Sequence, residues 1–273
     1  MNETLNKIVK ELEESDLAAL HPGLNGGLMG LSLFFFYYSR FHSNAAYEDF
    51  AYGILETVLT KIENNVVASN YAYGLSGIGS CIDFLSKEKF VEIDSEDYFE
   101  ELDNRIIESI KLSPVLDYGF QTGLIGLCNY FILHQGNKTS EVLKITLDQI
   151  CSGFAIPGFP KHPIDTVFLM PSEILRDIKL FLRKIEKLKF HAEQINLLKF
   201  HIEKFENEHT ILQTNCLKYY KIQYLRETVG FENKPLSKDM LDNCVANLSD
   251  KAIQGLTWMY YEKPTLPNVW KIL

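Results

Sequence analysis

A short glycine-containing motif occurs three times in the first half of the chain, and this repeat constrains the fold more than any other feature. The motif G-L-x-G-[L/I] occupies residues 27–31, 74–78 and 123–127, so successive copies start 47 and 49 residues apart. Self-similarity at such a period is typical of repeat architectures. Each copy runs directly into an apolar stretch. This order indicates a loop that enters a largely buried helix.

The motif glycines are expected to mark the corners where loops become helices. They are Gly27, Gly30, Gly74, Gly77, Gly123 and Gly126. Glycine permits positive φ angles and lets neighbouring backbones approach closely. Between the copies lie more amphipathic segments, 47–63 and 140–151. We therefore predict alternating inner and outer helices, with inner helices that begin within a few residues of Gly30, Gly77 and Gly126.

This alternation predicts an all-α fold, specifically an incomplete α/α toroid. Helical-hairpin solenoids usually have shorter repeats with their signature residues on helix faces, whereas these glycines stand at helix corners. Residues 20–135 carry the clear repeats, and residues 136–273 carry degenerate ones. We expect one domain over 1–273. A sheet of four or more strands would contradict this prediction.

Charge and hydropathy exclude several functional classes. The chain has 27 Lys and Arg against 36 Asp and Glu, for a formal charge of −9. Such an acidic chain is a poor ligand for phosphate backbones, so we expect no nucleic-acid partner. The longest apolar run, 28–38, is too short to span a bilayer. The first residues lack the pattern of a signal peptide. We expect no transmembrane segment and a cytoplasmic location.

The repeated motifs resemble those of the lanthionine synthetase C-like family. Residues 23–34 and 73–79 are similar to its first two repeats, and 124–130 to its third. Residues 254–258 and 267–273 resemble its last glycine motif and its closing tryptophan-containing tail. The resemblance implies an α/α toroid whose inner helices begin with these motifs. It also implies a role in peptide modification.

The family's enzymes cyclise peptides with zinc. The resemblance implies a zinc ion on two cysteines and a histidine, which binds a substrate cysteine as thiolate for addition to dehydroalanine or dehydrobutyrine. The metal is needed because a free thiol is mostly protonated at neutral pH. The family's ligands come from W-C-x-G and C-H-G motifs, but this sequence contains neither Trp-Cys nor Cys-His-Gly. We therefore expect no zinc cofactor. Cys216, near the expected fifth repeat, is the candidate relic ligand.

The second half of the chain departs from the repeat. The period places a fourth copy near residue 171, where no glycine stands, yet Pro171 and Ser172 still suit the first turn of a helix. Segment 172–207 carries a helix-period apolar stripe with a phase slip at 195–198. It predicts one long helix or a hairpin broken near the slip. The bases in 176–189 are interpreted as a solvated outer face rather than a groove for an acidic peptide.

Isolated histidines and cysteines have ordinary structural interpretations. No histidine pair has a recognised metal-binding spacing, and His21, beside the first glycine loop, is expected to make a local hydrogen bond. A buried, inert thiol is the plain alternative for Cys216.

Three functional hypotheses follow. The first is a family member without zinc that holds a peptide substrate or a peptide-modifying enzyme such as a dehydratase. The second is a working zinc-dependent cyclase that forms thioethers at a non-standard site from Cys216, Cys244 and a histidine. The third is a glycan-active α/α toroid, which would need two facing carboxylates.

Overall fold

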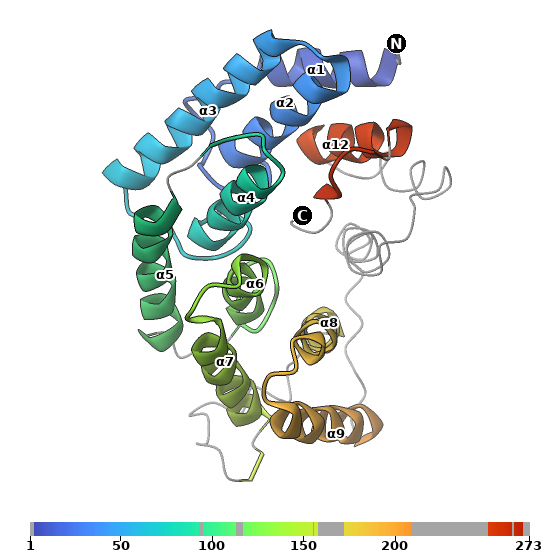
Figure 1. Cartoon of the computed structure of the whole chain (residues 1–273). Helices are drawn as coiled ribbons and strands as arrows, with labels where there is room; N and C mark the ends of the chain where they lie inside the picture. Colours follow the sequence, from blue (N-terminus) through green and yellow to red (C-terminus); the bar gives the residue numbers. More distant parts are fainter. Residues whose placement is uncertain are drawn as a thin grey trace. The chain divides into compact units, whose positions relative to one another are not determined.

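The computed structural model describes most of the chain (Figure 1). The described residues are 3–92, 95–112, 117–154, 156–157, 172–208, 251–263 and 265–269. Within these ranges all the helices are α-helices apart from a single 3₁₀ position, and there is no strand. The all-α fold class is therefore confirmed. In the same ranges, no helix combines the length and hydropathy that crossing a membrane requires.

The chain divides into two compact units. The first comprises Met1–Ala68, Ala72–Asp94 and Leu217–Leu273, and the second comprises Ser69–Tyr71 and Ser95–Cys216. The described helices of the first unit are α1 (Glu3–Glu13), α2 (Leu28–His42), α3 (Ala45–Asn64), α4 (Leu75–Lys87) and α12 (Lys251–Glu262). Those of the second are α5 (Ser95–Leu112), α6 (Leu124–His134), α7 (Thr139–Gly153), α8 (Ser172–Lys187) and α9 (Ala192–Glu208). The single domain over 1–273 stays a prediction.

The three motif helices are buried on nearly every side. Helix α2 begins at Leu28, α4 at Leu75 and α6 at Leu124, each one residue after the first glycine of its motif. The side chains from Leu28 to Ser39 are buried without interruption, as are those from Leu75 to Leu85. A helix that is apolar all round must lie inside the protein. The predicted inner helices and their starting points are confirmed.

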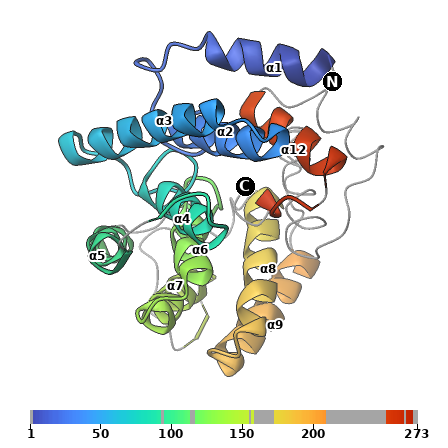
Figure 2. The ribbon, with the colours of Figure 1, turned by 45° about the horizontal axis from the view of Figure 1, so that its top comes forward.

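The helices between the motifs bury only one stripe. In α3 the buried side chains include Ile54, Val58 and Ile62, and α3 lies alongside α2 in the first unit (Figure 2). Its start is fixed by Asn44, whose side chain accepts a hydrogen bond from the Ala46 N–H at 3.1 Å. Helix α7 likewise covers the predicted segment 140–151. These segments are the outer helices that the sequence predicts.

The two ends of the chain help to complete the core of the first unit. Helix α1 packs on α12, and α12 packs on α2. At the α12–α2 contact, a Cβ at Gly255 would overlap the ring of Phe34, so any larger residue there would displace this buried ring. The buried Tyr37 of α2 donates its O–H to the Pro267 carbonyl at 2.8 Å. The segment 254–258 and the tail up to residue 269 are thus core elements, while 270–273 lie outside the described residues.

The segment 172–207 forms a hairpin in the second unit. Helix α8 ends at Lys187 and α9 begins at Ala192, several residues before the phase slip that suggested a break. Lys189 and His191 adopt left-handed φ angles of 58° and 52°, which stop the helix. Helix α8 exposes the bases that are interpreted as a solvated outer face: Arg183 and Lys187 are exposed, and Arg176, Lys179 and Lys184 are partly exposed. Its side chains Leu175, Ile178, Phe181, Leu182 and Ile185 are buried, and it packs on both α6 and α9.

Candidate functional site

The same backbone hydrogen bond closes the loop before each motif helix. The first helical residue donates its N–H to the carbonyl seven residues earlier. The pairs are Leu28 to His21 at 2.9 Å, Leu75 to Ala68 at 2.8 Å and Leu124 to Asp117 at 3.0 Å. An exposed helix start leaves orphan N–H groups, and here the preceding loop folds back to satisfy one of them. The repeat is therefore a structural unit of loop plus helix start.

The first glycine of each motif is the N-cap of its helix, in extended backbone. The φ angles of Gly27, Gly74 and Gly123 are −116°, −133° and −104°, so none needs the left-handed region that we considered from sequence. Among the described glycines, only Gly26 has a positive φ, at 69°. Glycine is required at Gly27 and Gly123 by space: a Cβ on Gly123 would overlap the Asp117 carbonyl.

The second glycine lies in the first turn of the helix, beneath the loop. A Cβ at Gly30 would overlap the Leu24 carbonyl oxygen, and one at Gly126 would overlap that of Phe120. The Gly126 Cβ would also lie 2.8 Å from Cβ of Tyr71. The predicted crowding is present at both positions. Its nearest source is the loop backbone six residues earlier in the chain. Gly77 is buried at the equivalent place in α4.

A side chain at the start of two of these loops reinforces them. His21 Nδ1 accepts a hydrogen bond from the Gly23 N–H at 3.1 Å, which confirms the predicted local hydrogen bond of His21. At the equivalent place in the third loop, Asp117 accepts from the Gly119 N–H at 2.7 Å and from the Thr122 hydroxyl. The second loop has Ala68 there, which lacks an acceptor. His21 therefore serves loop geometry.

A buried carboxylate on α8 contacts the third loop. Asp177 is 2 % exposed, and its Oδ2 accepts from the Phe120 N–H at 2.7 Å. About two turns further along the helix, Lys184 donates to Asn129 of α6 at 3.0 Å. Helix α8 begins at Ser172, where the sequence predicts a helix start that lacks the glycine motif. Polar side chains of α8 thus contact α6 and its loop.

The described cysteines are poor candidates for zinc ligands. Cys81, Cys128 and Cys151 are all buried. Burial raises the pKa of the Cys81 thiol well above its usual range, that of Cys128 to about 12 and that of Cys151 to about 11. A metal binds the thiolate, which these sites disfavour.

The described part of the chain holds no group of three or more His, Cys, Asp and Glu side chains that could bind a metal ion. The residues in that part therefore do not fit the family's zinc ion. Cys216 and Cys244, the two cysteines considered from sequence, lie outside the described residues.

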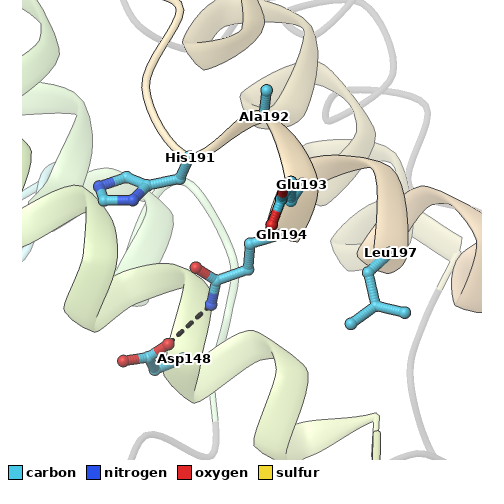
Figure 3. A pocket seen from close by; sticks show the side chains of 6 residues that line it. All are labelled: Asp148, His191, Ala192, Glu193, Gln194 and Leu197. Atoms are coloured by element: carbon cyan, nitrogen blue, oxygen red, sulfur yellow. Dashed lines mark hydrogen bonds between the residues drawn. The ribbon is translucent and has the colours of Figure 1, made fainter.

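An open cleft lies between α7 and the start of α9, wholly within the second unit (Figure 3). Its volume is about 550 Å³, within the range of small-ligand sites. Asp148 of α7 lines one side, and residues before and within the first turns of α9 line the other. These are His191, Ala192, Glu193, Gln194 and Leu197.

Hydrogen bonds hold the polar wall of this cleft in place. The Gln194 amide donates to Asp148 Oδ1 at 2.7 Å, and Lys144 pairs with Oδ2 at 3.1 Å. His191 Nε2 lies 3.2 Å from the Ser140 carbonyl. Because a carbonyl only accepts, Nε2 must carry the proton. No pattern in the sequence indicates this cleft. The left-handed conformation of His191 belongs to the break between α8 and α9, which the helical periodicity does not predict at this position.

A model of the lanthionine synthetase C-like protein family matches residues 19–161, more than half of the chain. The chain belongs to this family. The matched span contains all three glycine corners and helices α2 to α7, while α8, α9 and α12 lie beyond it. A search among curated proteins found no match. The predicted resemblance is thus confirmed, and the fold class agrees with the family's α/α toroid.

Proposed function

We propose that this lanthionine synthetase C-like chain binds a peptide, or the enzyme that modifies the peptide, and does not itself form thioethers. One observation carries the proposal: intact glycine corners stand beside a sequence without Cys-His-Gly or Trp-Cys. The resemblance places the family's zinc ligands in those two motifs. In an active member, zinc would supply a substrate thiolate at neutral pH.

The three loop–helix units support a scaffolding role. Each unit holds its helix start through a backbone hydrogen bond and, at Gly30 and Gly126, through contacts that leave no room for a Cβ. Sites on rigid elements can present a constant surface to a partner. The described cysteines are buried, and burial raises the pKa of each thiol, which disfavours the thiolate that a nucleophile or a metal ligand needs.

The test compares binding with cyclisation on one substrate. A precursor peptide that carries cysteine and dehydroalanine is titrated into the protein and its binding is measured by calorimetry. The mixture is then alkylated, and mass spectrometry counts the remaining thiols. We expect binding with all thiols still available to the alkylating agent. If neither this peptide nor a purified dehydratase binds, the proposal is wrong.

The alternative, a zinc-dependent cyclase with a non-standard site, makes the opposite prediction. Stoichiometric zinc in the purified protein, lost in Cys216→Ala together with thioether formation, would establish it. Substitution of Cys244 by Ala tests the second proposed ligand in the same way. A dehydratase gene beside this one would support the peptide-modification setting. The cytoplasmic location stays a prediction, which fractionation of cells would check.

A further inference from the structure

We propose that the α7–α9 cleft is the docking site for a peptide segment in which a lysine or arginine stands next to an apolar residue. This inference rests on the proposed peptide-binding function and names the class of segment. The cleft is lined by Asp148, His191, Ala192, Glu193, Gln194 and Leu197, and its volume of about 550 Å³ holds a few residues of a peptide.

Acceptor groups dominate the polar end of the cleft. Asp148 and Glu193 bring two carboxylates, and only one of them has a cation in place: Lys144 pairs with Asp148 at 3.1 Å. Among the described residues, Glu193 has no ion-pair partner, and its side chain is exposed. The bond from the Gln194 amide to Asp148 uses its nitrogen, which leaves its oxygen as a further acceptor. An ammonium or guanidinium group, which only donates, complements this end.

The other end of the cleft is apolar and solvent-accessible. Leu197 is 38 % exposed, and Phe200, one turn further along the same face of α9, is 62 % exposed. Lysine and arginine cover apolar surface with their methylene stems while the charge points elsewhere. A basic side chain therefore fits along Leu197 with its head at Glu193. A neighbouring apolar residue of the peptide would then cover Phe200.

Two synthetic peptides test the charge preference. Acetylated and amidated (Ala-Lys-Leu)₃ and (Ala-Glu-Leu)₃, each with a fluorophore, are titrated with the full chain at 0.15 M salt, roughly physiological ionic strength, and followed by anisotropy. The lysine peptide should bind and the glutamate peptide should not. The whole chain has a formal charge of −9, so it could attract the lysine peptide anywhere on its surface. Matched variants must therefore show that the peptide binds in the cleft.

Four variants locate the binding. Glu193→Gln should weaken binding of the lysine peptide about fivefold, since an exposed charge pair contributes up to about 1 kcal/mol. Glu108→Gln removes the same charge from the exposed face of α5 and should leave Kd unchanged. Leu197→Ser should weaken binding to a similar extent, whereas Val66→Ser changes a fully exposed apolar residue of the other unit and should not.

The outcomes separate this inference from the proposed function. Equal affinity in all four variants would mean general attraction to an acidic protein and would overturn the cleft as the docking site. The same holds if the glutamate peptide binds as well as the lysine peptide. Either result leaves precursor binding, measured separately by calorimetry, intact as a test of function. If the precursor competes with the lysine peptide for the parent protein but not for Glu193→Gln, the cleft is also the site at which the precursor binds.

Discussion

The three helix pairs that begin with a glycine motif (α2–α3, α4–α5 and α6–α7) and the α8–α9 hairpin hold their first helix in place by different contacts. In the glycine repeats, a loop folds over the first turn of its own inner helix, and backbone atoms touch where no side chain fits. The sequence before α8 lacks the glycine motif. The buried Asp177 and half-buried Lys184 of this helix contact α6 and its loop instead.

This difference explains why the repeat is visible in the sequence of the first half of the chain and not in that of the second half. A backbone corner needs glycine at fixed local positions, so it leaves a periodic trace in the sequence. A side-chain tie such as Asp177 to Phe120 joins residues 57 positions apart, and no local pattern records it. Loss of the glycine motif therefore does not mean loss of the helix.

The largest effect should come from filling a glycine corner. Gly126→Ala would place Cβ on the Phe120 carbonyl, where backbone rather than a flexible side chain must shift. We expect a loss of about 3 kcal/mol or more of unfolding free energy, or no folded protein. Urea denaturation followed by circular dichroism measures it.

The matched control is Gly53→Ala, inside α3. Nothing lies within 4 Å of a Cβ at Gly53, so alanine should stabilise by up to about 1 kcal/mol through its helix propensity. Gly136, in a polar turn outside the motif, is a poorer control because its Cβ would lie 3.0 Å from the His134 ring. If Gly126→Ala were as stable as Gly53→Ala, the packed corner would not exist.

The next effect concerns the side-chain tie that links α8 to the third loop. Asp177→Ala leaves the buried Phe120 N–H without its acceptor and should cost about 2 kcal/mol. Asp177→Asn keeps an acceptor oxygen and should cost less than about 1 kcal/mol. Denaturation curves of both variants decide the point. An alanine variant as stable as the parent protein would show that the bond from Phe120 to Asp177 does not stabilise the packing of α8.

A smaller effect is expected at the ion pair that joins α8 to α9. Lys179 and Glu206 lie 2.5 Å apart and are 38 % and 29 % exposed. Lys179→Met should cost up to about 1 kcal/mol at low salt and less at about 1 M salt, because ions screen exposed charges. The control is Lys10→Met. Lys10 lies 3.9 Å from Glu14, both side chains are largely exposed, and loss of this pair should have no measurable effect on stability. If the loss of stability in Lys179→Met did not depend on salt, it would come from packing of the methylene groups of Lys179 rather than from the ion pair.

The smallest effect is a pH dependence within a glycine repeat. Burial raises the pKa of Asp103 on α5, although the Tyr130 O–H, at 2.8 Å, acts in the opposite direction. A raised folded-state pKa means that this group's contribution is complete below the unfolded pKa of about 3.9 and is lost as the pH rises through the folded value.

Asp103→Asn keeps the acceptor for Tyr130 and removes the titration. Its stability relative to the parent should therefore increase as the pH rises from acid towards neutral. Tyr130→Phe should enlarge the parent's pH dependence, because it removes a donor that favours the ionised form. Thermal unfolding at a series of pH values tests both, and parallel curves for Asp103→Asn and the parent would contradict the assignment.

Sequence alone determined the inner helices α2, α4 and α6, their starting residues, the outer helices α3 and α7, and the family. These features are local: a glycine three residues from another, followed by an apolar run, specifies a loop and a helix start through contacts within seven residues. It also anticipated that a helix would begin at Ser172 and that His21 would bond within its loop.

Only the tertiary structure decided the remaining features. The break at Leu188 to His191, the burial of α8 and the cleft beside Asp148 depend on contacts between elements far apart in the chain, such as Gln194 with Asp148 across 46 positions. Gly255 likewise owes its identity to the ring of Phe34 at the opposite end of the sequence. Periodicity and composition report contacts within one segment. The positions of these residues depend instead on contacts with segments far away in the sequence.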